Sequence, residues 1–186
     1  MTRPRYLPGD LAVWLLILAE LAVFALLFVG FAVARAFDPA TFAAGRAELH
    51  PGVGLASTLS LIVASYLVAT ATVGYRRGRD GTAVRLWLAL LVSLAYTLGK
   101  LWEYGQLYGA GYHLGSDTFF MFYFFLTFFH FLHVVVGQGV LLALARKARR
   151  PWQDDRDTNA MESGACYWHM VDLVWLALFP LLYVVA

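Results

Sequence analysis

The stretch that decides the fold is Glu162–Ala186, ESGACYWHMVDLVWLALFPLLYVVA. Most of it is apolar and long enough to cross a bilayer as a helix, yet its first half carries Glu162, His169 and Asp172. A helix has about 3.6 residues per turn, so Glu162 and His169 share one face, and Asp172 follows one turn later on nearly the same side. Because ionisable groups are costly in lipid, we expect these side chains to face protein, water or lipid headgroups.

The composition of the whole chain places this helix in a membrane protein. Of its 186 residues, 61% are hydrophobic and 14% are charged, whereas soluble domains carry roughly a quarter of charged residues. A span needs ~20 apolar residues, so about five spans account for most of the chain and leave no room for a soluble domain. Cys166 is the only cysteine, which excludes an intramolecular disulfide and a cysteine-based zinc or iron–sulfur site.

Five apolar runs predict an all-α integral membrane protein, a bundle of five transmembrane helices that forms a single domain over residues 1–186. The predicted spans are 11–34, 53–75, 86–107, 118–145 and 165–185. The first run is too long for a signal-peptide core and is predicted to be retained. The second is rich in Ser, Thr, Ala and Gly, which favours close helix packing. Residues 35–52 are predicted to be a polar connection, and Pro180 is predicted to bend the last helix.

The distribution of Lys and Arg predicts the orientation in the membrane. Basic residues gather before the first span and in the second and fourth loops, whereas the first loop has two and the third has none. The basic residues of the three clusters are Arg3, Arg5, Arg76, Arg77, Arg79, Arg85, Arg146, Lys147, Arg149, Arg150 and Arg156. This pattern predicts a cytoplasmic N-terminus and a periplasmic C-terminus in the bacterial cytoplasmic (inner) membrane.

Two sets of ionisable residues lie within the predicted spans. Glu20 is the only charged residue of the first run; it is either a proton-relay carboxylate or a neutral, hydrogen-bonded acid used in packing. Lys100 and Glu103 are three residues apart, so they can pair on one helical face, as an ion pair at a helix end or as a subunit contact.

The histidines raise the question of a metal or haem. His130, His133 and His169 lie in or beside spans, and two histidines from different helices could ligate a haem b. No Glu-x-x-His motif accompanies them, so hydrogen bonds to neighbouring helices or a headgroup boundary are the favoured interpretation. Tryptophans such as Trp168 and Trp175 are predicted to be interfacial anchors. The sequence has no P-loop, dinucleotide-binding turn, nucleophile elbow or nucleic-acid-binding module.

Four motifs carry a resemblance to the haem-copper (cytochrome c) oxidase subunit III family. Glu162–Trp175, ESGACYWHMVDLVW, closely resembles the signature of the family's last helix. Phe129–Gly137, FHFLHVVVG, is similar to the family's histidine pair with the valine-rich positions and glycine that follow. Glu103 and Tyr104 match its Glu-Tyr, and Glu20 matches its single buried glutamate. These motifs occur in the family's order and cover essentially the whole chain.

Within that family the chain resembles the short branch. It has five predicted spans where the long form has seven, and Lys100 stands where the long form usually has glutamine. The sequence of the last helix, including its final residues Phe179–Tyr183, FPLLY, is most similar to that of the NorE-type accessory protein of nitric oxide reductase. In the long form, lipids lie in a cleft between the first two helices and the rest, and one wall of that cleft is absent from a five-span chain.

The resemblance implies a non-catalytic accessory subunit that binds no haem or copper itself, with phospholipid as the one possible ligand. Its implied partner is the haem-bearing catalytic subunit of a nitric oxide reductase or terminal oxidase, in aerobic or denitrifying electron transport, where it would support assembly, stability and proton uptake. Glu20 is implied to be the buried carboxylate. The residues implied to make polar, lipid or helix contacts, none of them a metal ligand, are Glu103, His130, His133, Glu162, His169 and Asp172. Two alternatives are an independent small transporter or proton channel that uses Glu20, and a haem b membrane anchor.

Overall fold

The computed structural model describes residues 9–78, 80–149 and 155–185. The helices found there are α1 (Leu11–Phe37), α2 (Pro39–Ala47), α3 (Pro51–Arg76), α4 (Thr82–Gly109), α5 (Thr118–Lys147) and α6 (Asp155–Pro180), followed by a π-helical turn, η1 (Leu181–Val185). Five helical segments are long and apolar enough to cross a membrane, namely α1, α3, α4, α5 and the Thr158–Val185 part of α6 and η1. The predicted all-helical architecture with five possible spans is therefore confirmed for the described part of the chain.

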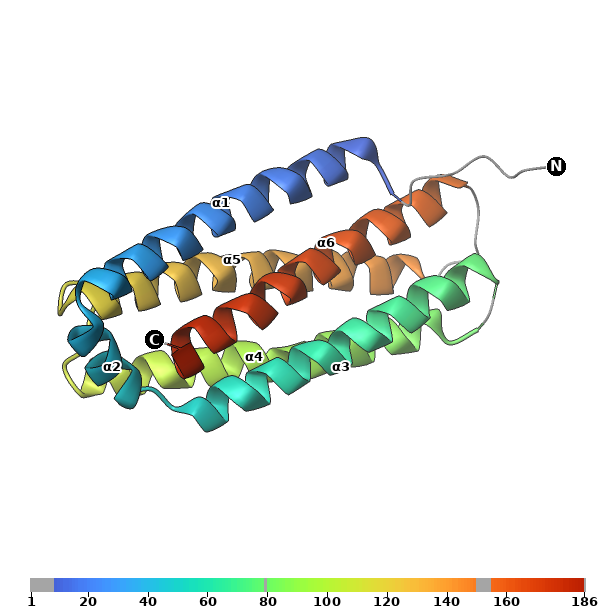
Figure 1. The fold of residues 1–186 in the computed structure, drawn as a ribbon. Helices are drawn as coiled ribbons and strands as arrows, with labels where there is room; N and C mark the ends of the chain where they lie inside the picture. The colour runs from blue at the N-terminus through green and yellow to red at the C-terminus, as the bar shows by residue number, and fades with distance from the viewer. Residues whose placement is uncertain (1–8, 79, 150–154, 186) are drawn as a thin grey trace.

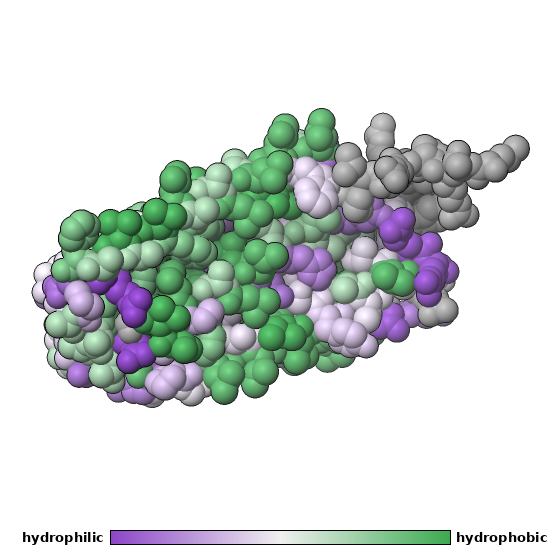
Figure 2. Space-filling model, in the orientation of Figure 1, coloured by the Kyte–Doolittle hydropathy of each residue, from purple (hydrophilic) through white to green (hydrophobic). Residues whose placement is uncertain are grey.

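The long helices run side by side along one axis, and α2 lies across one end of the bundle (Figure 1). The pair α3 and α4 has the most extensive contact, and α5 and α6 complete the core. α1 packs against α6 and α5 at the edge of the bundle, where most of its residues remain exposed. In the view of Figure 2, apolar residues cover much of the long sides and hydrophilic residues gather mainly toward the two ends, as expected of a membrane-spanning bundle.

Arg35 and Arg46, in the last turns of α1 and α2, lie at one end of the bundle, and the described basic residues of the second and fourth loops lie at the other (Figure 1). The latter residues follow α3, begin α4 and end α5, and all three of these termini lie at the end where α1 begins (Figure 1). Of the residues that predict the orientation, Arg3, Arg5, Arg79 and Arg150 lie outside the described residues, as does the side chain of Arg156.

The segment 35–52 is not only a polar connection, because it contains the helix α2. Asp38 caps this helix: its carboxylate accepts hydrogen bonds from the Thr41 hydroxyl, at 2.6 Å, and the Thr41 N–H, at 3.2 Å. These two bonds hold the pKa of Asp38 below its usual value. Pro39 occupies the first turn, where its missing N–H costs nothing. Phe42 is fully buried and packs α2 against the ring of Phe31. The Asp38 cap, Pro39 and this aromatic contact together stabilise a short helix.

The last helix begins earlier and ends differently from the prediction. It starts at Asp155 rather than at 165, because its polar first turns continue the helix and bury Met161 and Glu162. At its other end the α-helical pattern stops at Pro180 and η1 follows. Proline lacks the N–H that an α-helix would donate to the preceding turn, which accounts for the change of helix type at this position.

Small residues line the buried face of α3, as the composition of the second run predicted. Its buried positions are Gly54, Ser57, Thr58, Leu61, Ala64, Ser65, Val68, Ala71 and Gly74. Such residues allow helix backbones to approach closely in a membrane, where packing and interhelical hydrogen bonds hold helices together. α3 therefore brings its hydroxyl groups within reach of polar side chains on α6.

Candidate functional site

A closed polar network surrounds Lys100 and Glu103, which are 1% and 0% exposed. The Lys100 ammonium donates to Glu103 Oε2 at 2.9 Å and to the hydroxyls of Tyr123 at 3.1 Å and Tyr183 at 2.7 Å. Both phenols donate in turn to the same Glu103 oxygen, at 2.8 Å and 2.6 Å. All three ammonium protons thus have acceptors, which is the condition for burying a charge at tolerable cost.

This network joins three elements of the bundle and the residue that precedes a fourth. Lys100 and Glu103 come from α4, Tyr123 from α5 and Tyr183 from η1, and the N–H of His50, just before α3, lies 3.4 Å from Glu103 Oε1. The ammonium also lies 4.8–5.7 Å from the ring centroids of four aromatic residues, Tyr104, Tyr123, Trp175 and Tyr183, close enough for cation–π attraction. The predicted ion pair is present, but it is enclosed within the chain and so is not a surface contact for another subunit.

Glu20 meets His133 between α1 and α5. The distance from His133 Nε2 to Glu20 Oε2 is 3.1 Å, and His133 Nδ1 lies 2.8 Å from the carbonyl oxygen of Phe129. A carbonyl oxygen only accepts hydrogen bonds, so the contact with Phe129 assigns the donor role to Nδ1 and leaves Nε2 facing the Glu20 carboxyl group. Predicted to be buried, Glu20 is only partly so: its side chain is 24% exposed and that of His133 is 13% exposed.

His130 has different surroundings from His133, although the two lie on one helix. Its ring is fully buried and stacks on Trp175 at 5.4 Å, with the edge of Tyr96 at 5.7 Å. Among the described residues neither ring nitrogen has a hydrogen-bond partner. His130 therefore packs as an aromatic ring in the core, while His133 faces Glu20.

The polar residues that open the last helix face α3. Ser65 Oγ and His169 Nδ1 lie 2.7 Å apart, and Asp172, 8% exposed, lies close enough to interact with both. Glu162, only 2% exposed, lies further toward the basic end, with Arg76 Nε 3.1 Å from its Oε1. That is an ion-pair distance, although the N–H is not aligned for a hydrogen bond. The predicted shared face exists, since Glu162 and His169 both line a cleft of about 180 Å³ between α3 and α6.

The same turn of α6 also holds the start of α1. Glu162 Oε2 accepts a hydrogen bond from the Gly9 N–H at 3.1 Å, and Ser163 Oγ accepts one from the Asp10 N–H at 3.0 Å. Gly9 has a positive φ of 85°, which suits glycine at this close approach. α1 is thus held at its start by α6 and further along by the Glu20–His133 pair.

Several residues of these clusters were not predicted from the sequence. Trp175, expected to be an interfacial anchor, is fully buried and donates from Nε1 to Thr58 Oγ1 at 2.9 Å. Trp168 is likewise 1% exposed. The residues around Tyr123 and Tyr183 do not predict their hydrogen bonds to Lys100 either, because each tyrosine comes from a distant part of the chain. Within the described ranges, no three His, Cys, Asp or Glu side chains come together as ligands of a metal ion.

Comparison with known proteins gives a consistent match. The family described as cytochrome c oxidase subunit III matches residues 9–186. Cytochrome c oxidase subunit 3 of Synechocystis is 30% identical over 91% of this chain and 72% of its own length. Probable cytochrome c oxidase subunit 3 of Mycobacterium tuberculosis (strain H37Rv) is 30% identical over 98% of this chain and 90% of its own. That of Nocardia farcinica is 27% identical over the full chain.

Proposed function

Because the chain belongs to the cytochrome c oxidase subunit III family, we propose that it is a non-catalytic accessory subunit of a respiratory haem-copper oxidase complex. The observation that carries the proposal is that the side chains of the family motifs form contacts within the bundle. Glu103 pairs with Lys100 on its own helix and meets tyrosines from two other elements, His133 pairs with Glu20, and His169 pairs with Ser65. These contacts hold helices together and do not converge on one reaction site.

The proposed role is to support assembly, stability and proton uptake of the catalytic subunit. A bundle braced by buried polar contacts presents a fixed surface to a neighbouring membrane subunit. The Glu20–His133 pair supports the proton-uptake part of the proposal, because it places a carboxyl group and an imidazole within hydrogen-bond distance and both side chains are partly exposed. In this proposal the haem and copper chemistry belongs to the partner, and this chain binds at most phospholipid.

The proposed partner is the haem-bearing catalytic subunit of a terminal oxidase. The names of the relatives described above support this choice. The catalytic subunit of a nitric oxide reductase is the second candidate, supported by the NorE-like sequence of Trp168–Trp175 and Phe179–Tyr183. The short length of the chain does not distinguish the two candidate partners, because 90% of the M. tuberculosis oxidase subunit aligns with this chain.

The proposed location is the bacterial cytoplasmic membrane, with the N-terminus inside and the C-terminus in the periplasm. The positive-inside rule supports this orientation, because the described basic clusters lie at one end of the bundle.

Affinity purification from native membranes in a mild detergent tests the proposal. We expect a tagged chain to co-purify with a haem-bearing subunit that mass spectrometry identifies as an oxidase or nitric oxide reductase component. The chain expressed alone should show no Soret band. The proposal fails if the isolated chain binds haem and loses it on His130→Ala or His169→Ala. It also fails if the chain purifies without a partner and supports proton flux in liposomes that Glu20→Gln abolishes.

A further inference from the structure

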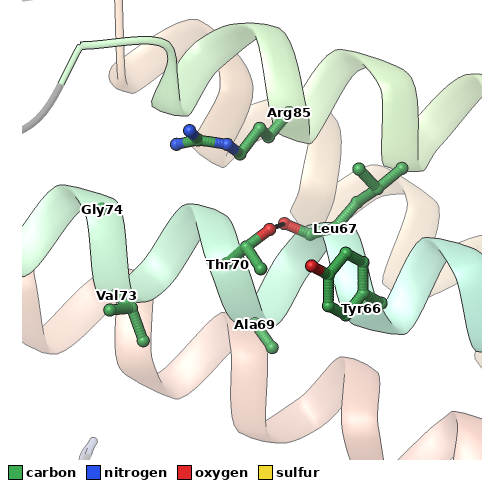
Figure 3. Close-up of a pocket in the computed structure, with 7 residues that line it drawn as sticks. All are labelled: Tyr66, Leu67, Ala69, Thr70, Val73, Gly74 and Arg85. Atoms are coloured by element: carbon green, nitrogen blue, oxygen red, sulfur yellow. Dashed lines mark hydrogen bonds between the residues drawn. The ribbon is translucent and has the colours of Figure 1, made fainter.

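A cleft of about 490 Å³ lies between α3 and α4 on the outside of the bundle (Figure 3). Its lining residues are Tyr66, Leu67, Ala69, Thr70, Val73, Gly74 and Arg85. All but Arg85 come from α3, and Arg85 reaches over them from α4 (Figure 3). The Tyr66 side of the cleft is open to the surroundings, since this residue is 67% exposed. The volume falls within the range of about 300–1,000 Å³ that is typical of small-ligand sites.

The cleft spans the depth from a membrane surface into the hydrocarbon. Gly74 lies near the end of α3 and Arg85 near the start of α4, at the end of the bundle where the described basic residues gather. Tyr66 comes eight residues before Gly74 on the same helix, which places it about 12 Å deeper. The upper part of the cleft therefore carries a charge, and the lower part is lined mainly by apolar side chains.

The charge of Arg85 is not neutralised within the described part of the chain. Arg76 lines the neighbouring cleft on the other side of α3 and has Glu162 as its partner. No described carboxylate forms an ion pair with Arg85. Gly74 allows its guanidinium to lie against α3, because a Cβ there would stand 3.0 Å from Arg85 Nη1. The two clefts are thus alike in position, but only one contains its own counter-ion.

We propose that this α3–α4 cleft binds a phospholipid with an anionic headgroup. The Arg85 guanidinium binds the phosphodiester, since its paired N–H groups match two phosphate oxygens. Below the headgroup, Val73, Leu67 and the ring of Tyr66, which lies about 12 Å deeper than Gly74, contact the acyl chains. A soluble anion would use only the charged upper part, whereas a phospholipid uses both. The site is built from α3 and α4 alone, unlike the cleft of the long family form.

Lipid titration of the purified full-length chain, followed by native mass spectrometry, tests this assignment. The probes are phosphatidylglycerol and phosphatidylcholine with the same acyl chains. Arg85→Gln removes the charge and keeps most of the side-chain length, and Thr70→Phe fills the cleft and keeps the charge. Arg77→Gln is the matched control, because Arg77 is exposed at the end of α3 and does not line the cleft. Circular dichroism checks that each variant is folded.

We expect the wild-type chain to prefer phosphatidylglycerol. Arg85→Gln and Thr70→Phe should each weaken that binding about fivefold or more, and Arg77→Gln should leave it within about twofold. The assignment is overturned if Arg77→Gln and Arg85→Gln weaken binding equally, which would indicate surface charge alone, or if Thr70→Phe has no effect. The measurement needs no partner subunit, so its failure would not affect the accessory function proposed above.

Discussion

Replacing Lys100 by methionine is expected to destabilise the bundle more than the same replacement of a basic residue on its surface. Methionine fills similar space but removes the ammonium that donates to Glu103 Oε2 at 2.9 Å. Glu103 is 0% exposed, so its carboxylate would remain buried with two phenols and one long backbone contact as donors. Removing one partner of a buried ion pair costs about 3–5 kcal/mol. We expect a loss of this size in the free energy of unfolding.

Unfolding by sodium dodecyl sulfate in mixed micelles, followed by circular dichroism, gives that free energy. Arg146→Met is the matched control, since Arg146 is exposed in the last turn of α5 and its replacement should change stability by less than about 0.5 kcal/mol. Glu103→Gln leaves the ammonium buried without its carboxylate and should also destabilise. Because Lys100→Met and Glu103→Gln together remove both charges, the double variant should lose at least about 1 kcal/mol less than the sum of the two single losses.

Two results would refute this reasoning. One is a Lys100→Met variant as stable as the Arg146→Met control, which would mean that the buried charge of Glu103 needs no partner. The other is strict additivity of Lys100→Met and Glu103→Gln, which would mean that the two groups do not interact across their 2.9 Å contact.

Two further predictions concern α1 and the packing of α5 against α6. Glu20→Gln should accumulate in membranes normally, because its amide can donate to His133 Nε2, whereas Glu20→Leu should lose about 0.5–2 kcal/mol of unfolding free energy; equal stability of the two variants would contradict the pairing. Gly137→Ala should lose about 1–3 kcal/mol, because its Cβ would stand 2.9 Å from the Trp168 ring. A Cβ at Gly139, on the same helix, would meet no described atom within 4 Å apart from the adjacent backbone of α5, so Gly139→Ala should be neutral or stabilising in the same assay; equal losses at both glycines would argue against the close contact.

The architecture of the chain was largely predictable from the sequence. Long apolar runs have few alternatives to membrane-spanning helices, because a backbone in lipid must satisfy its own hydrogen bonds. The pairing of Lys100 with Glu103 was also predictable, since three residues along a helix bring two side chains to one face. The helix α2 was missed because the prolines and glycines of 35–52 were interpreted as breaks. Asp38 and Pro39 in fact form a helix start there.

The polar contacts between helices were not predictable in the same way. Glu20 and His133 are 113 residues apart, and Ser65 and His169 are 104 apart. Trp175 shows the difficulty most clearly, because its position near a predicted span end suggested an interfacial anchor. Its indole is buried and bonds to Thr58 of α3, and nothing in the residues around Trp175 distinguishes these two environments.

By itself, the sequence determined the five apolar helices, the clustering of basic residues in alternate loops and the face shared by Glu162, His169 and Asp172. Each of these depends on helical periodicity or on local composition. Only the tertiary structure decided that this face meets α3, that Lys100 is enclosed by aromatic rings and that Arg85 lies over an open cleft. The physical reason is that helices which are apolar on most sides can pack in several rotations, so the choice rests on close contacts between residues far apart in the chain.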